Sequence, residues 1–205
     1  TTPELLLHAT ATRDGRFDQL TTEPIKGSRP RGRDAISDEA ERLALDADPK
    51  ERAELAMIVD VERNDLGSVS KFSTVRIATL PHVVTHPTIH HRQALLVGRA
   101  RADVTRAQVI AAMVPSGSVT GAPKVAAMEQ IAKLEAHRRG LYTGAIGCVG
   151  HDASVCLAMA IRTLVLGDRR GHYFTGGGIV AASDPAREVA ETALKALQLT
   201  QLTQE

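Results

Sequence analysis

Strand-like runs occur in clusters along this sequence, and helical patterns separate the clusters without alternating with single strands. Residues 5–12 and 17–23 are apolar and β-branched runs joined by a glycine-containing turn, which predicts a hairpin. Further strand patterns lie at 73–80, 92–100, 142–150, 154–167 and 172–183. Because a parallel sheet needs strands that alternate with helices, this order favours an α+β fold with mainly antiparallel sheets flanked by helices.

Helix signals occupy the remaining segments. Ser37 carries an N-cap signature, and Asp48-Pro49 begins a second helix that we expect to end near Gly67 as a left-handed cap. Further helical patterns cover 105–114, 122–137 and about 184–199. The stretch PIKGSRPRG, residues 24–32, contains two Pro and two Gly and predicts a loop.

Composition excludes several classes of partner and location. The net charge is +1 and aromatic residues make up 2% of the chain, which argues against nucleic-acid binding. No apolar run reaches the roughly 18 residues of a membrane span, and no signal-peptide pattern opens the chain. Two cysteines in apolar surroundings, Cys148 and Cys156, indicate buried reduced thiols. We therefore expect a soluble cytoplasmic protein of one domain.

Two acidic doublets are candidate metal ligands. Glu51 and Glu54 form one, Glu188 and Glu191 the other, and a spacing of three residues puts both carboxylates of a doublet on one helix face. Four such oxygen ligands would suit Mg²⁺. Solvated doublets paired with neighbouring arginines are the structural alternative, because this pattern is common on helix surfaces.

Three other patterns offer binding or catalytic groups. The glycine-rich stretches 117–124 and 175–180 could bring backbone N–H groups to a carboxylate or phosphate, or could simply form tight turns. Lys26 lies among arginines, where a lysine can act as nucleophile or base, although such a segment can also simply bind anions. A histidine cluster at 82–91 lacks a zinc spacing, so a proton carrier or anion donor is the better interpretation.

The order of these segments resembles the chorismate-utilising enzymes, a family that includes component I of anthranilate synthase, component I of aminodeoxychorismate synthase, and the isochorismate and salicylate synthases. The resemblance covers nearly the whole chain. It is carried by PIKGSRPRG (24–32), DPKERAELAMIVDVERNDLG (48–67), GSVTGAPKVAAMEQI (117–131), RRGLYTGAIGCVG (138–150), AMAIRT (158–163) and GGGIVAASDPAREVAETALKA (176–196).

The resemblance implies a role for each matching residue. The acidic doublets would hold the Mg²⁺ that binds the ring carboxylate of chorismate. Glu4, in TTPE, matches the general acid that helps the C4 hydroxyl leave. His91, in IHHRQ, matches a catalytic histidine, although residues 92–94 depart from the family's HHLVS. The matching substrate-binding residues are Ser28, Thr120, Tyr142, Arg162, Gly176, Gly177, Gly178 and Lys195.

Lys26 separates the reactions within this family. Anthranilate, isochorismate and salicylate synthases usually carry a small residue there, whereas aminodeoxychorismate synthases carry the lysine proposed to attack C2 of chorismate. The resemblance thus implies an aminodeoxychorismate synthase component I that makes 4-amino-4-deoxychorismate, for p-aminobenzoate and folate synthesis, with ammonia from a glutamine amidotransferase (glutaminase) subunit. An anthranilate synthase component I of tryptophan biosynthesis is the alternative.

Length adds a third hypothesis. Members of this family usually run to more than twice 205 residues, and this chain begins at Thr1 without Met. We therefore expect residues 1–205 to be the C-terminal portion of a chorismate-binding catalytic domain, incomplete at its N-terminus. A truncated portion of this kind could fold or associate without turning over substrate.

Overall fold

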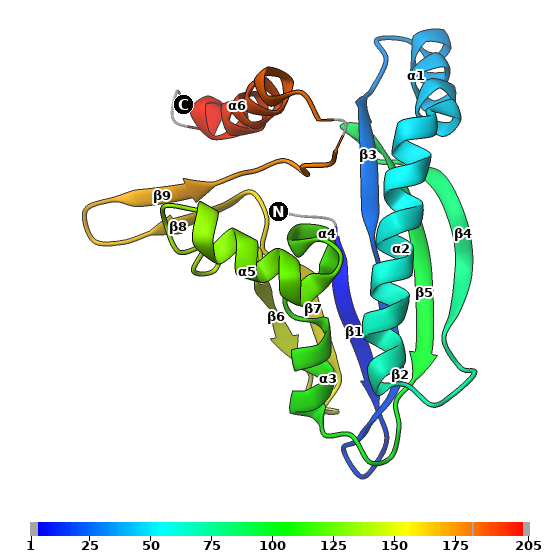
Figure 1. Cartoon of the computed structure of the whole chain (residues 1–205). Coiled ribbons are helices and arrows are strands. Elements are labelled where there is room, and N and C mark those ends of the chain that lie inside the picture. Colours follow the sequence, from blue (N-terminus) through cyan, green and yellow to red (C-terminus); the bar gives the residue numbers. More distant parts are fainter. Residues whose placement is uncertain (1–3, 182, 203–205) are drawn as a thin grey trace.

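An antiparallel sheet forms the centre of the molecule, with helices on one face (Figure 1). The computed structural model describes residues 4–181 and 183–202. The strands are β1 (Leu5–Ala11), β2 (Phe17–Glu23), β3 (Ile25–Pro30), β4 (Arg76–Thr85), β5 (Ile89–Arg99), β6 (Ala145–Val149), β7 (Val155–Met159), β8 (Thr163–Leu166) and β9 (Gly171–Phe174). The helices are α1 (Ala35–Ala47), α2 (Pro49–Val69), α3 (Arg106–Met113), α4 (Gly117–Thr120), α5 (Lys124–Leu134) and α6 (Pro185–Leu202).

Strand β5 organises the seven-stranded sheet, whose main path is β3-β5-β2-β1-β7-β6. The C-terminal half of β5 pairs with β2, and the N-terminal half of β5 pairs with β3. These two strands therefore follow each other along one edge of β5. Strand β4 pairs with the other edge. Every pairing is antiparallel, which confirms the expected α+β architecture.

The core lies between this sheet and helices α2 and α3. Asp48 caps α2 by accepting the N–H groups of Lys50 and Glu51, and Pro49 fits the first helical position, as the sequence predicts. Leu55, Ile58, Val59, Leu66 and Val69 are buried on one side of α2 and recur at helical spacing. All of these except Ile58 belong to one core cluster with leucines of the sheet, namely Leu7, Leu20 and Leu96.

Segment 24–32 corrects the sequence analysis most strongly. It forms strand β3 instead of a loop, because pairing with β5 satisfies its backbone groups. Pro30 is the last residue of the strand, where its missing N–H is tolerated. Gly27 has φ +85° and lies where the register shifts between Ile25 and Ser28, so the glycine supplies an irregularity inside the strand.

Several element boundaries also differ from the expectations. Asp34 and not Ser37 is the N-cap of α1, and Gly67 lies inside α2, which continues to Val69 because its last turn still packs on the core. The expected helix at 122–137 is the shorter α5, which follows its N-cap residue Pro123, and the turn before it contains the short helix α4. The stretch at 154–167 contains two strands, and both cysteines are free but exposed.

The chain after Ala160 is organised differently. Strands β8 and β9 form a separate two-stranded sheet that projects from the helices, and α6 lies beside it (Figure 1). Of the described residues in this C-terminal region, which we define as 161–202, none is buried. We call residues 4–160 the sheet region. Among the described residues, no helix has both the length and the apolar character that a membrane crossing requires.

Candidate active site

Lys26 projects from the irregular part of β3 toward the C-terminal region. Its Nζ lies 3.8 Å from the position that a Cβ would occupy on Gly178, in the glycine-rich segment after β9. The left-handed Gly27 is the next residue, and Lys26 lies inside the register shift between Ile25 and Ser28, an irregularity of the kind that often occurs next to functional sites. Residues far apart in the sequence are thus brought together.

Glu4 is buried just before β1, with 6% of its surface exposed. The Ser118 hydroxyl, in α4, donates a hydrogen bond of 3.0 Å to Glu4 Oε1. Burial raises the pKa of Glu4, and the Ser118 hydrogen bond and the positive charges of Lys26 and Arg162 only partly oppose that effect. Glu4 therefore holds its proton to a higher pH than an exposed glutamate, as a general acid must.

His91 is buried on β5, at a position that pairs with β3, the strand that carries Lys26. Its Nδ1 lies 2.8 Å from the Ser28 hydroxyl. Burial lowers the pKa of His91, and the nearby His86 and Arg162 lower it further, so the imidazole is neutral at neutral pH. The adjacent His90 has a separate role, because it is fully buried between Asp38 and Thr85.

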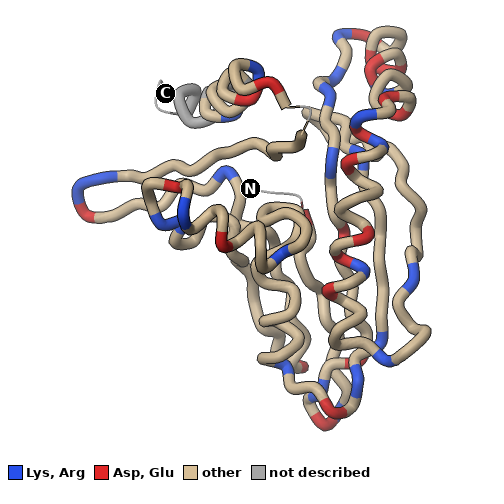
Figure 2. The backbone as a smooth tube through the Cα atoms, viewed as in Figure 1, with Lys and Arg blue, Asp and Glu red and all other residues tan. Residues whose placement is uncertain are grey.

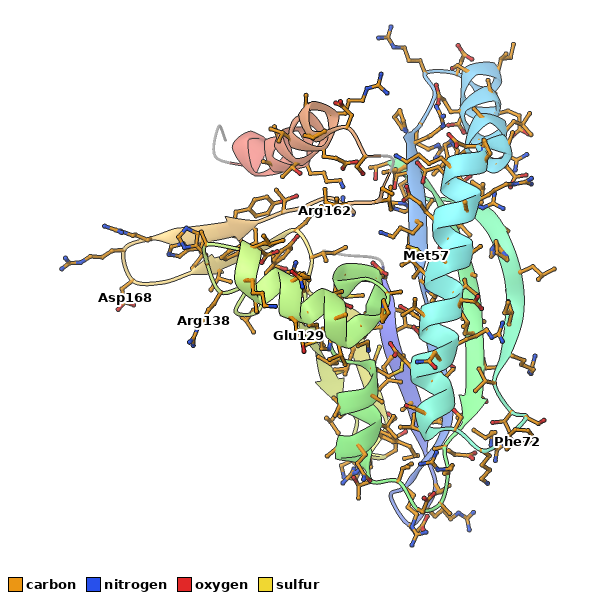
Figure 3. All side chains as sticks on the ribbon, viewed as in Figure 1. Met57, Phe72, Glu129, Arg138, Arg162 and Asp168 are labelled. Atoms are coloured by element: carbon orange, nitrogen blue, oxygen red, sulfur yellow. The ribbon has the colours of Figure 1, made fainter. Side chains whose placement is uncertain are left out.

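Arg162 joins the two regions. It is the second residue after Ala160, adopts a left-handed φ of +49°, and lies beside the chain that follows β9 (Figure 3). Its charge acts on both Glu4 and His91. A guanidinium at this place can form a bidentate pair with a substrate carboxylate, donating two parallel hydrogen bonds.

The remaining predicted substrate residues divide into two groups. Lys195 Nζ donates to the Gly176 carbonyl over 3.2 Å, and the Tyr142 hydroxyl lies 2.5 Å from a Cβ built on the same glycine. These residues and Gly177 therefore lie around one segment. Thr120 lies apart from that group, in α4, where its hydroxyl donates to the Ser116 carbonyl over 2.9 Å.

The acidic doublets are brought only partly together. Glu51 Oε2 lies 2.9 Å from a Cβ built on Gly27, and Glu188 Oε2 lies 3.0 Å from a Cβ built on Gly177. Glu54 Oε1 lies 3.6 Å from Lys50 Nζ. Glu191 has its side chain outside the described part of the structure. Within that part, no three histidine, cysteine or acidic side chains form a metal-binding group.

The environment of these carboxylates nevertheless fits Mg²⁺. Each glycine leaves open the space that a side chain would take beside a carboxylate, and carboxylate oxygens are the ligands that this hard cation prefers. Basic residues on β3 lie beside the acidic residues of α2 (Figure 2).

The structure also shows site residues that the sequence analysis missed. Glu62 and Asp65 are buried on α2 among its apolar positions. Ser116 and Ser118, at the start of α4, contact Glu62 and Glu4 respectively. The sequence held a signal that Glu62 is buried. Glu62 lies four residues from both Ile58 and Leu66, so it falls on the same face of the helix as these apolar residues.

Comparison with known proteins identifies the family of the chain. The sequence matches the family of chorismate binding enzymes over residues 1–201. The chain belongs to the chorismate-binding enzyme family. It is 47% identical over 190 residues to an anthranilate synthase component 1 of Haloarcula marismortui, covering 93% of this chain and 38% of that protein.

Two further relatives are named for two different reactions. An aminodeoxychorismate synthase of Streptomyces pristinaespiralis is 43% identical over 175 residues, covering 85% of this chain and 24% of that protein. The crystal structure of anthranilate synthase component I from Streptococcus pneumoniae matches with a TM-score of 0.81 and 35% identity, over 95% of this chain and 41% of that one. The chain thus spans well under half the length of these relatives.

Proposed function

We propose that the complete protein converts chorismate and ammonia into 4-amino-4-deoxychorismate, with Lys26 as nucleophile and Glu4 as general acid. The position of Lys26 carries this proposal. Its amine lies at the glycine-rich segment, and its charge acts on a buried glutamate with a raised pKa. Nucleophile and acid therefore face one site from β3 and from the start of β1.

The chemistry proceeds in two displacements. The lone pair of the Lys26 amine forms a bond to C2 of chorismate while both conjugated ring double bonds shift and the C4–O bond breaks. Glu4 gives its proton to the departing hydroxyl, which leaves as water. Ammonia then forms a bond to C4, the two double bonds shift back, and the C2–N bond breaks to release Lys26. Loss of a proton from the new ammonium completes the exchange.

The other site residues bind and orient the substrate. Arg162 and Tyr142 would hold a carboxylate, and the neutral His91 with Ser28 would supply polar contacts beside Lys26. Glu51, Glu54, Glu188 and Glu191 would hold Mg²⁺, which neutralises the ring carboxylate when bound. The ammonia would come from a glutamine amidotransferase subunit, because relatives named component 1 imply a second component.

Amination at C2 by an anthranilate synthase component I is the second candidate. The 47% identity to the Haloarcula protein favours it, and Lys26 would then have no covalent role. Incubating the complete protein with chorismate, Mg²⁺ and ammonium separates the two, because anthranilate is fluorescent and 4-amino-4-deoxychorismate is resolved by chromatography. Direct formation of anthranilate would overturn our proposal. The same assay on residues 1–205 alone tests whether this portion is inert.

Substitution of the nucleophile gives a sharper test. We expect Lys26→Ala to abolish C4 amination in the complete protein while chorismate still binds, because the amine is needed for bond formation and not for holding the carboxylates. Product chromatography and calorimetric titration with chorismate measure the two properties. Lys71→Ala, an exposed lysine between α2 and β4, is the matched control. Unchanged product formation in Lys26→Ala would rule out covalent catalysis.

A further inference from the structure

Glu62 is a fully buried carboxyl that the proposed reaction does not use. It lies on the face of α2 that packs on the sheet, and 1% of its surface is exposed. Both of its oxygens accept hydrogen bonds from hydroxyl groups, Oε2 from Thr22 over 2.6 Å and Oε1 from Ser116 over 2.9 Å. A buried carboxyl with two such partners is costly to assemble and is held in one orientation.

The hydrogen bonds of Glu62 lead directly to Glu4. The Ser116 hydroxyl, which donates to Glu62, also accepts the backbone N–H of Ser118 over 3.0 Å. Ser118 in turn donates its own hydroxyl to Glu4 Oε1 over 3.0 Å. Ser116 is the N-cap of α4 and Ser118 follows inside that helix, so one short turn of chain contacts both carboxyls.

We propose that Glu62 is a positioning residue for Glu4, holding the Ser116–Ser118 turn against it and, through its own negative charge, keeping the proton on Glu4. The two buried carboxyls then titrate as a coupled pair. This inference rests on the proposed function of Glu4 as the acid, and it names a residue that controls that acid without touching the substrate.

The charges around the pair support this behaviour. Burial, together with the negative charges of Glu4 and Asp65, raises the pKa of Glu62 to about 7, although the hydrogen bonds from Thr22 and Ser116 oppose the rise. Asp65 is itself compensated by Lys124, whose Nζ lies 2.7 Å away. On the side of Glu4 the facing charges are Lys26 and Arg162. Because like charges act reciprocally, an ionised Glu62 raises the pKa of Glu4.

The local hydrogen bonds can serve both protonation states of Glu62. When Glu62 is ionised, Thr22 donates to it. When Glu62 is protonated, Thr22 can accept its proton and donate instead to the Leu5 carbonyl, which lies 3.3 Å from the same hydroxyl oxygen. No buried polar group loses its partner in this exchange, so the structure tolerates the gain and loss of a proton at Glu62.

The test is the pH dependence of kcat/KM for Glu62→Gln in the complete protein. Glutamine keeps the size and removes the charge, so Glu4 should lose its proton at a lower pH. We expect the alkaline limb of the profile to shift to lower pH by about one unit. Above neutral pH, kcat/KM should therefore be about tenfold lower than in the wild type, and below neutral pH it should change little. Glu129→Gln, on the exposed face of α5, is the matched control and should leave the profile unchanged (Figure 3).

Two additional measurements keep the inference testable. Thr22→Val removes one hydrogen bond that favours ionised Glu62, so it should move the same limb in the same direction by less. Infrared titration without substrate of the Glu4 carboxylic acid band, assigned by its loss in Glu4→Gln, should show that band disappearing at lower pH in Glu62→Gln than in the wild type. A uniform loss of activity at every pH with an unmoved infrared titration would overturn the inference. Absence of aminated product from the wild type would overturn only the proposed reaction.

Discussion

The sheet region and the C-terminal region both contribute to the candidate site, but they are held together in different ways. All the buried apolar side chains among the described residues lie in the sheet region, from Leu6 to Ala160. The C-terminal region contributes Gly178 and Glu188 while burying none of its described residues. Groups proposed to exchange protons and bonds therefore lie on the packed part of the molecule, whereas groups proposed to hold the substrate or metal come from both parts.

This difference has a physical reason. A raised carboxyl pKa requires burial, and only the packed sheet and α2 provide it, as at Glu4 and Glu62. Metal and carboxylate ligands work in a wet environment and need only a few directed contacts. In the C-terminal region these are the hydrogen bonds from Ser183 to Glu188, 2.7 Å, and from Lys195 to the Gly176 carbonyl.

The largest expected effect tests the packing of the two regions. Leu20, in β2, is fully buried, whereas Leu166, in β8, is 75% exposed. We expect Leu20→Ala to lower the free energy of unfolding by about 2–5 kcal/mol because it leaves a cavity, and Leu166→Ala to change it by less than about 0.5 kcal/mol. Urea denaturation of the complete protein measures both. Equal losses for the two variants would show that the C-terminal region is packed as tightly as the sheet region.

A substitution at Gly27, where the two regions meet, should have an effect of intermediate size on stability. The φ of +85° at Gly27 disfavours any other residue, and an added Cβ would lie 2.9 Å from Glu51 Oε2 and 3.0 Å from the buried Leu45 side chain. We expect Gly27→Ala to cost about 2 kcal/mol of stability and to weaken Mg²⁺ binding. Denaturation and calorimetric titration with Mg²⁺ measure the two effects.

Gly15 is the matched control for that substitution. Its φ is +75°, and an added Cβ would meet nothing within 4 Å. Gly15→Ala should therefore show the cost of the left-handed backbone alone, about 1–2 kcal/mol, with unchanged Mg²⁺ affinity. If both variants bind Mg²⁺ as the wild type does, the contact between Gly27 and Glu51 has no part in metal binding.

Sequence patterns predicted the sheet region better than the site within it. The β1–β2 hairpin and the start of α2 at Asp48 follow from local rules of turns and caps, and both were confirmed. Strand β3 was missed because its pairing with β5 spans residues distant in sequence, and such pairing overrides the local preference of Pro and Gly for loops.

The candidate site was predictable only where a motif carried it. Lys26 was singled out by the arginines around it and Glu4 through family resemblance, and the structure then placed their charges close together. Glu62 was not found, because its spacing from Ile58 and Leu66 indicates the core face of α2 but not the hydrogen-bond partners it meets there. The Ser116–Ser118 turn that links it to Glu4 depends on contacts between segments more than 50 residues apart, which no local pattern encodes.

The smallest expected effect on stability tests whether the C-terminal region serves the site and not the fold. A Cβ added at Gly177 would lie 3.0 Å from Glu188 Oε2, the mobile end of an incompletely buried side chain, with no buried neighbour to displace. We expect Gly177→Ala to change stability by less than about 0.5 kcal/mol but to lower Mg²⁺ affinity by about tenfold, because it moves a proposed ligand. Gly167→Ala, in the β8–β9 turn with its nearest neighbour at 3.5 Å, is the control and should alter neither property. Loss of stability without loss of Mg²⁺ affinity in Gly177→Ala would reverse the comparison, since this glycine would then support packing instead of the metal site.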